Sequence, residues 1–303
     1  MIFDRALNET FVRRLAEEAD SGGWWQDVLA DRSLLVAPRR TALNVYWRGQ
    51  ALFNVSCPHG QLAVSTHEKF LVDPALAGQV PLVAGRFDTA ASLERALFRS
   101  YEGLATLAKM KRAATLFSGE EKSGCHEIAV RNAGVIDVEV AFPGRLVLAD
   151  GGEKTAPRID LASVEADGDD VRLTFWEAKA YANGELRALG DGAAPVCTQI
   201  ETYRLALAQH RADIEASYAA VAANLVAFKA MGWQRELSPL IEAVGRGERR
   251  LTLGAFPKVG LVVFGFDSGQ RDEPRWKKHL DRLRATIGEV RAVGDPKNLR
   301  VGA

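Results

Sequence analysis

A strand-like segment near the middle of the chain ends with an acid and a base that could act together. The segment reads Phe175-Trp176-Glu177-Ala178-Lys179. Residues two apart on a strand point to the same face of a sheet, so Glu177 and Lys179 should project side by side. We expect a lysine at a strand end to contribute little to packing.

A second acid is expected beside this pair. Residues 158–165 and 171–178 are typical of two strands, and the Asp-Gly-Asp-Asp sequence between them is a strong turn signal. Counting outward from the turn puts Asp160 opposite Glu177. Two carboxylates next to a lysine predict a Mg²⁺ site with a positioned cation.

The acid-x-lysine triplet alone is a weak signal. It also occurs as Glu120-Glu121-Lys122 and as Asp295-Pro296-Lys297. Only the triplet that begins at Glu177 ends an apolar strand with another acid at hairpin distance. The alternative interpretation is a surface ion pair at a strand end.

The next helical segment adds two polar residues. Gln199 and Tyr203 lie four residues apart, on one face of a helix expected to begin at Pro195. Leu207 continues the same face toward the core. We expect both polar side chains to face the end of the Glu177–Lys179 strand. The alternative is that Tyr203 only packs and Gln199 is solvated.

The elements around these residues predict a mixed α/β domain with a central sheet. An apolar stripe that includes Leu93 and Leu104 predicts a long helix from Asp88 or Thr89. The expected order after that helix is a helix over 120–131, strands over 135–142, 158–165 and 171–178, a helix from Pro195 to about Met231 with a break near His210, a strand over 259–266, and a helix from Pro274.

The front of the chain has a different character. A helix is expected over 9–19, followed by strands over 33–37, 43–47, 51–55 and 62–65 that form a small antiparallel β-meander. We therefore divide the chain into a module of residues 1–87 and a domain of residues 88–303. The aromatic residues of the front module favour core packing over base stacking. The module could cover a cleft, read a DNA feature or bind a protein partner.

Asp160, Glu177-Ala178-Lys179 and Gln199-x-x-x-Tyr203 together resemble the PD-(D/E)XK nuclease superfamily, in particular its RecB-like branch. The resemblance covers about residues 90–270 and does not explain the first 85. Ile159-Asp160 stands where the family has Pro-Asp. The resemblance implies a restriction-endonuclease-like core of a helix, three strands, a helix and a strand.

The resemblance also implies an activity, the divalent-metal-dependent hydrolysis of phosphodiester bonds in nucleic acid. DNA is the expected substrate. Asp160, Glu177 and the Ala178 carbonyl would hold Mg²⁺, with Mn²⁺ as a substitute. Lys179 would orient or deprotonate the attacking water. Gln199 and Tyr203 would steady the Lys179 side of the site.

Family members often carry a further acid on the first core helix. Glu127 is the expected residue, with Glu120 and Glu121 as rivals. The setting that the resemblance implies is bacterial DNA repair or defence against foreign DNA. The alternatives are a non-catalytic module that binds nucleic acid or a protein partner, and an enzyme that acts on RNA.

Composition limits how the chain could contact nucleic acid. The 303 residues are 47% hydrophobic and 26% charged, and the basic and acidic residues number 39 each. A zero net charge excludes a strongly cationic coat for nucleic acid or membrane, so phosphate contacts must come from a metal or a local patch. Two basic clusters are the candidates for a groove that follows the phosphate backbone. They consist of Arg246, Arg249 and Arg250, and of Arg271, Arg275, Lys277 and Lys278.

The remaining signals predict a cytoplasmic protein with no membrane partner. The three cysteines form no Cys-x-x-Cys pair, which excludes a four-cysteine iron–sulfur cluster and fits a reducing compartment. The first residues, with an acid at Asp4, lack the basic-then-apolar order of a signal peptide. The longest apolar stretch is far too short to span a bilayer.

Overall fold

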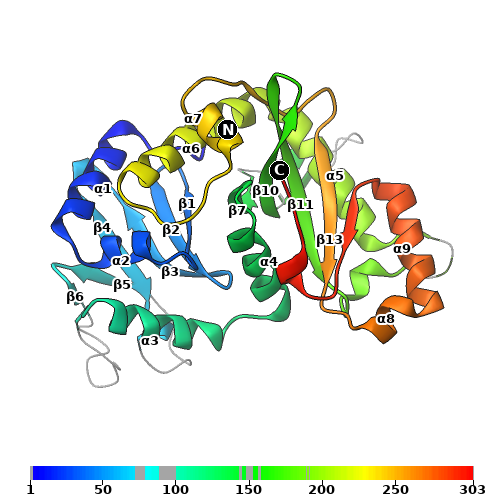
Figure 1. The fold of residues 1–303 in the computed structure, drawn as a ribbon, viewed down its shortest axis with the longest axis horizontal. Coiled ribbons are helices and arrows are strands. Elements are labelled where there is room, and N and C mark those ends of the chain that lie inside the picture. Colours follow the sequence, from blue (N-terminus) through cyan, green and yellow to red (C-terminus); the bar gives the residue numbers. More distant parts are fainter. Residues whose placement is uncertain are drawn as a thin grey trace. The chain divides into compact units, whose positions relative to one another are not determined.

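The computed structural model describes residues 3–71, 79–88, 100–142, 145–147, 153–155, 158–188, 190 and 192–302. They form a mixed α/β structure with two six-stranded sheets (Figure 1). The chain divides into two compact units. The N-terminal unit comprises Asp4–Gly119 and Ala220–Glu236, and the C-terminal unit comprises Met1–Phe3, Glu120–Ala219 and Leu237–Ala303.

The N-terminal unit is built on an antiparallel meander whose strands are adjacent in chain order, as predicted. Its strands are β1 (Leu35–Pro38), β2 (Ala42–Trp47), β3 (Gln50–Ser56), β4 (Ala63–His67), β5 (Gln79–Val83) and β6 (Arg86–Phe87). The helices α1 (Glu9–Ser21) and α2 (Trp24–Ala30) precede it. Trp24, Trp25 and Phe53 are buried, so the packing interpretation of these aromatics is confirmed.

The N-terminal unit does not end at residue 87, where the sequence placed the boundary. Helix α3 (Leu104–Thr115) belongs to it, because Lys111 Nζ lies 2.7 Å from Asp31 Oδ2 and Trp47 Nε1 donates to Thr115 Oγ1 at 3.0 Å. The long helix expected from Asp88 is also wrong in part. Helix α3 begins only after Gly103, whose φ of 67° breaks the helical path, and residues 89–99 lie outside the described residues.

A second correction concerns α6 (Arg211–Ala230), whose C-terminal part belongs to the N-terminal unit. Asn224 Oδ1 accepts from Leu7 N at 2.8 Å, and its Nδ2 donates to Leu7 O at 3.3 Å. Phe228 meets Trp25 edge to face at 5.8 Å. These contacts attach residues 220–236 to a segment that lies some two hundred positions earlier in the chain.

The C-terminal unit is built on a mixed sheet in the order β14-β13-β11-β10-β7, with β12 beside β11. Its strands are β7 (Val135–Ala141), β10 (Arg158–Asp167), β11 (Asp170–Ala180), β12 (Leu251–Thr252), β13 (Lys258–Phe264) and β14 (Val290–Ala292). The first three strands, β7, β10 and β11, pair antiparallel, whereas β13 runs parallel to β11. A separate hairpin joins β8 (Arg145–Val147) and β9 (Glu153–Thr155).

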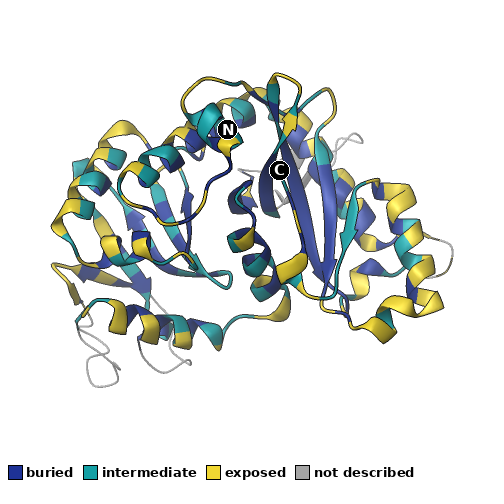
Figure 2. Cartoon of the chain, in the orientation of Figure 1, coloured by how far each residue is buried: buried dark blue, intermediate teal, exposed yellow. Residues whose placement is uncertain are grey.

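Helices cover both faces of this sheet. They are α4 (Glu120–Arg131), α5 (Pro195–Gln209), the start of α6, α7 (Pro239–Gly245), α8 (Ser268–Asp272) and α9 (Pro274–Ile287). Figure 1 shows α4 on one side of the strands and α5 and α9 on the other. The central strands β11 and β13 are buried along most of their length (Figure 2), as expected for apolar runs covered on both faces.

Most expected elements of this unit are confirmed. Helix α4 has the predicted bounds, α9 begins at Pro274, and the predicted break near His210 separates α5 from α6. Among the described residues, none of the helices is both long enough and apolar enough to cross a bilayer.

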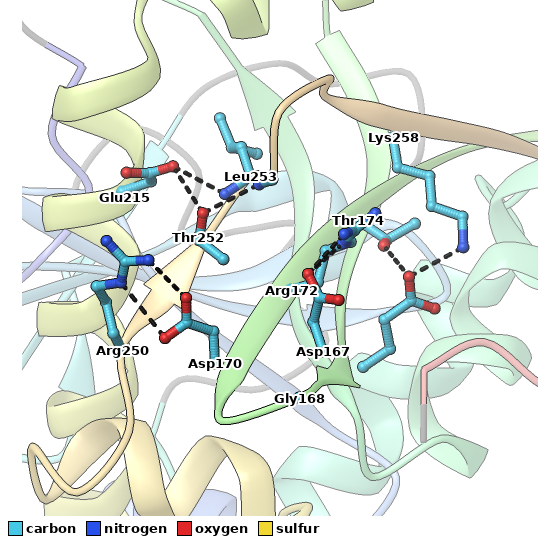
Figure 3. Close-up of polar contacts among 12 residues, drawn as sticks. Asp167, Gly168, Asp170, Arg172, Thr174, Glu215, Arg250, Thr252, Leu253 and Lys258 are labelled. Atoms are coloured by element: carbon cyan, nitrogen blue, oxygen red, sulfur yellow. Dashed lines mark hydrogen bonds and ion pairs between the residues drawn. The ribbon is translucent and has the colours of Figure 1, made fainter.

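Ion pairs and backbone hydrogen bonds hold the arginines of one of the two basic clusters, which lies at the turn between β10 and β11. Arg250 Nη2 lies 2.5 Å from Asp170 Oδ2 (Figure 3). Arg249 donates to the backbone carbonyls of Asp169 and Asp170. Arg246 pairs with both Glu242 and Glu248. These arginines fasten the hairpin end and the helix beside it, which weakens the expectation that they contact phosphate.

Close packing of α4 against the end of β13 predicts that Gly124→Ala is destabilising. A Cβ at Gly124 would lie 2.1 Å from Phe264 Cε2, which is a steric clash with a rigid ring. Alanine would gain about 1 kcal/mol of helix propensity, but overpacking costs about 1–3 kcal/mol, so we expect a net loss. Urea unfolding measures it. Gly119→Ala, where a Cβ meets nothing within 4 Å, is the control and should leave stability nearly unchanged.

Candidate active site

The strand register brings Asp160 and Glu177 together. Leu161 is paired with Trp176, and one step further along the two strands Asp160 lies opposite Glu177. At that step the hydrogen-bond acceptor is the Asp160 side chain and not a backbone carbonyl, because Ala178 N donates to Asp160 Oδ2 at 2.8 Å. The prediction from the hairpin count, two carboxylates on adjacent antiparallel strands, is confirmed.

Lys179 lies on the same face as Glu177, as the two-residue spacing predicts. Its Nζ is 2.8 Å from Glu177 Oε1 and 2.6 Å from Glu185 Oε2. Glu177 is only 3% exposed and Lys179 only 7%, so this is a buried ion pair. Both the alternative of a surface pair and the expectation of a weakly packed lysine are wrong, because β13 and the turn after β11 enclose this end of the strand.

A third acid, Glu139 on β7, completes a row across three strands. Asp160 lies between the pairs Ile159–Val140 and Leu161–Val138, which makes Glu139 its neighbour on β7. Glu139 has a φ of 52°, a backbone conformation that costs about 1–3 kcal/mol for a residue other than glycine. The sequence analysis missed Glu139, although an acid inside an apolar strand was a signal for it.

Helix α4 contributes Glu121 instead of the expected Glu127. Glu121 Oε1 accepts from Ala180 N at 3.0 Å and from Asn183 Nδ2 at 2.6 Å, at the end of β11. Glu127 lies six residues further along the helix and pairs with Arg131 at 3.4 Å. The sequence alone did not show which face of α4 meets β11, so it did not separate the rival acids.

The turn after β11 carries Glu185, which the sequence analysis also missed. Asn183 Oδ1 caps the 3₁₀ turn Gly184–Leu186 by accepting from Glu185 N at 2.8 Å. Arg187 Nη1 donates to Tyr181 O at 2.7 Å and to Asn183 O at 3.1 Å. The turn is therefore held at several points, and it brings a half-exposed carboxylate to Lys179.

Helix α5 places Gln199 and Tyr203 as a bonded pair. Gln199 Nε2 donates to Tyr203 Oη at 2.6 Å, and Tyr203 Oη donates to Arg158 O at 3.0 Å. Tyr203 is 2% exposed, and the Glu177 carboxylate is close enough to act on its hydroxyl. The expected orientation toward Glu177 is thus borne out for Tyr203. Gln199 bonds to Tyr203, so its expected role on the Lys179 side of the site would act through that residue.

The electrostatics of the site show an excess of buried negative charge. Burial and the charge of Glu177 raise the pKa of Asp160 well above its usual range. Burial also raises the pKa of Glu177, although Lys179 opposes the shift. Burial alone would lower the pKa of Lys179, but Glu177 and Glu185 raise it, so the amine stays protonated. Desolvation and the charges of the neighbouring acids, Asp160 first, also raise the pKa of the Cys125 thiol.

The donor set suits a hard divalent cation. Glu177 Oε2 is buried and has no hydrogen-bond partner among the described residues, and the charge of Glu177 disfavours the charged form of Asp160. Carboxylate and carbonyl oxygens are the ligands that Mg²⁺ prefers. In the part of the chain that the structure describes, no cluster of three or more His, Cys, Asp or Glu side chains converges on one point. The expected set has only two carboxylates and the Ala178 carbonyl, whose role stays a prediction.

The Tyr203 bonds predict the effect of Tyr203→Phe. The change removes a hydroxyl that bonds both Gln199 and the Arg158 carbonyl, at a cost of about 1 kcal/mol per bond. We expect a loss of about 1–2 kcal/mol in urea unfolding. Tyr203→Ala should lose about 3 kcal/mol or more, since it also empties a core position. Equal stability of the two variants would contradict the packed position of the ring.

Comparison with known proteins gives no match, since no family model, no curated protein and no solved structure is significantly similar to this chain. The functional argument therefore depends on the chemistry of this cluster of residues.

Proposed function

We propose that this chain is a divalent-metal-dependent nuclease with a PD-(D/E)XK-like core. It would hydrolyse phosphodiester bonds of nucleic acid, and DNA is the expected substrate. The observation that supports it most is that Asp160 lies beside the buried pair of Glu177 and Lys179 at one end of the sheet. The order α4, β7, β10, β11, α5, β13 supports a restriction-endonuclease-like core. A role in bacterial DNA repair or defence follows only from the family resemblance.

The residues of the site divide the work. Asp160, Glu177 and the Ala178 carbonyl would hold Mg²⁺ or Mn²⁺, which when bound polarises a phosphate and makes a bound water more acidic. Lys179, kept protonated by two carboxylates, is placed to stabilise negative charge that develops on the phosphate. Tyr203 fixes the backbone at Arg158, two residues before Asp160.

A cleavage assay tests the proposal. Supercoiled, linear and single-stranded DNA, and RNA, are incubated with Mg²⁺, Mn²⁺ or EDTA. We expect cleavage of DNA with either metal, no cleavage in EDTA, and none by a Glu177→Gln variant. Glu165→Gln, which changes an acid at the other end of the sheet, should cleave like the wild type. Cleavage by Glu177→Gln at the wild-type rate, or binding without cleavage under every condition, would contradict the proposal.

A further inference from the structure

One side of α9 carries four basic side chains. Residues three, four and seven positions apart share a helix face, and this spacing relates four residues here. They are Arg275, Lys278, His279 and Arg282. The other face of α9, with Trp276, Leu283 and Ile287, is buried against the sheet side of the unit. The basic side chains therefore lie beside the buried face, with Arg275 and Lys278 exposed and His279 and Arg282 half-buried.

Three other basic residues of α8 and α9 already take part in ion pairs. Arg271 and Lys277 lie 3.0 and 3.1 Å from the Asp272 carboxylate, and Arg284 lies 3.6 Å from Asp281. Arg275 and Lys278 differ, because among the described residues no acid lies within ion-pair distance of either. Both side chains are exposed. These basic residues are thus either paired with an acid or, like Arg275 and Lys278, exposed with no acid within ion-pair distance among the described residues.

Arg187 extends the basic face toward the turn after β11. Its guanidinium lies 4.7 Å from the centre of the Tyr181 ring and 5.6 Å from that of Trp276, the α9 residue next to Arg275. Burial lowers the pKa of His279, and the charges of Arg187, Arg275, Arg282 and Lys278 lower it further. His279 and Arg282 also line a pocket of about 330 Å³.

The basic face begins beside the candidate active site. Tyr181, two residues after Lys179, packs edge to face on Trp276 at 4.9 Å and donates its hydroxyl to Glu273 Oε2 at 3.2 Å. From there the face runs along α9 for about 10 Å, at 1.5 Å per residue. One strand of a duplex places a phosphate every 3.4 Å along the axis, so this length corresponds to about three phosphates.

We propose that these five residues, the α9 stripe of Arg187, Arg275, Lys278, His279 and Arg282, bind the phosphate backbone of nucleic acid next to the position of cleavage. The proposal rests on the proposed nuclease function and names the part of the surface that holds the substrate. A protein with no net charge needs such a local patch, because its overall field attracts no polyanion.

The test measures binding without cleavage. A fluorescein-labelled 30-base-pair DNA duplex is titrated in EDTA at several salt concentrations, with wild type and with Arg275→Ala/Lys278→Ala. Losing two phosphate contacts should weaken binding and lower the slope of log K against log salt by about 2. The matched control is Arg271→Ala/Lys277→Ala, which removes the same net charge from residues that are both paired with Asp272. It should leave the slope unchanged.

The outcomes separate the stripe from the nuclease function. Weaker binding by the stripe variant alone supports the stripe, even if no condition gives cleavage and the nuclease proposal fails. Equal loss in both double variants would assign the effect to net charge and overturn the stripe. Unchanged binding and unchanged KM in the stripe variant, with metal-dependent cleavage intact, would overturn the stripe alone. A wild-type chain that binds no DNA and no RNA would overturn both proposals.

Discussion

Lys179→Met should abolish cleavage and also destabilise the protein. Loss of a positioned acid–base group typically costs about 10²–10⁴ in rate. The structure adds an effect on stability. Removing Lys179 leaves the Glu177 carboxylate buried without its cation, and breaking a buried pair in this way costs about 3–5 kcal/mol. Glu185 is half exposed and should keep enough hydration to tolerate the change. Urea unfolding and a cleavage assay on the same preparation measure both effects.

Two further variants separate these effects. Glu177→Gln/Lys179→Met removes both charges, so we expect most of the lost stability to return while activity stays absent. Lys258→Met breaks a Lys–Glu pair at the other end of the sheet, where Lys258 lies 2.9 Å from Glu165 and both side chains are more exposed. That variant should lose about 1 kcal/mol or less and keep wild-type activity. Normal turnover by Lys179→Met would show that Lys179 has only a structural role.

Asp160→Asn should abolish cleavage but stabilise the metal-free protein. Burial and Glu177 raise the pKa of Asp160, so the folded protein binds this proton more tightly than the unfolded chain does. The resulting stability is present at acidic pH and is lost as the pH rises through the raised pKa. Asparagine keeps an acceptor for Ala178 N but has no charge to place there. The free energy of unfolding of the Asp160→Asn variant should therefore fall less with rising pH than that of the wild type.

Thermal melts with and without Mg²⁺ complete this test. A ligand that binds only the folded state raises Tm, so wild type should melt higher in Mg²⁺ than in EDTA, whereas Asp160→Asn should melt at the same temperature in both. Asp170→Asn, at the exposed hairpin end, is the control and should keep the Mg²⁺ shift. A wild-type Tm that does not respond to Mg²⁺ or Mn²⁺, with Asp160→Asn less stable than wild type, would contradict the metal site.

The features that local pattern determines could be predicted from the sequence. The pairing of Asp160 with Glu177 follows from one turn and the two-residue period of strands, and both are local properties. Helix α4, the break at His210 and the start of α9 follow from apolar spacing and from proline or polar residues at helix ends. These predictions hold because no distant contact overrides the local preference.

The features that depend on how elements pack could not be predicted. Glu139 reaches the site because β7 pairs with β10 on the side away from β11, and Glu121 does so because of the rotation of α4. Glu185 depends on a capped turn that holds it against Lys179. The burial of Lys179 likewise comes from its surroundings, not from its position at a strand end.

The path of α6 has a consequence for how the protein is made. The N-terminal unit consists of residues 4–119 completed by residues 220–236, which supply Phe228 against Trp25 and Asn224 against Leu7. A ribosome adds about 5–20 residues per second, so the meander waits some five to twenty seconds for this helix after residue 119 is added. During that interval Phe228 does not yet pack against Trp25. We therefore infer that a fragment cut at residue 119 would aggregate, and that separating the units requires a circular permutation or a grafted helix.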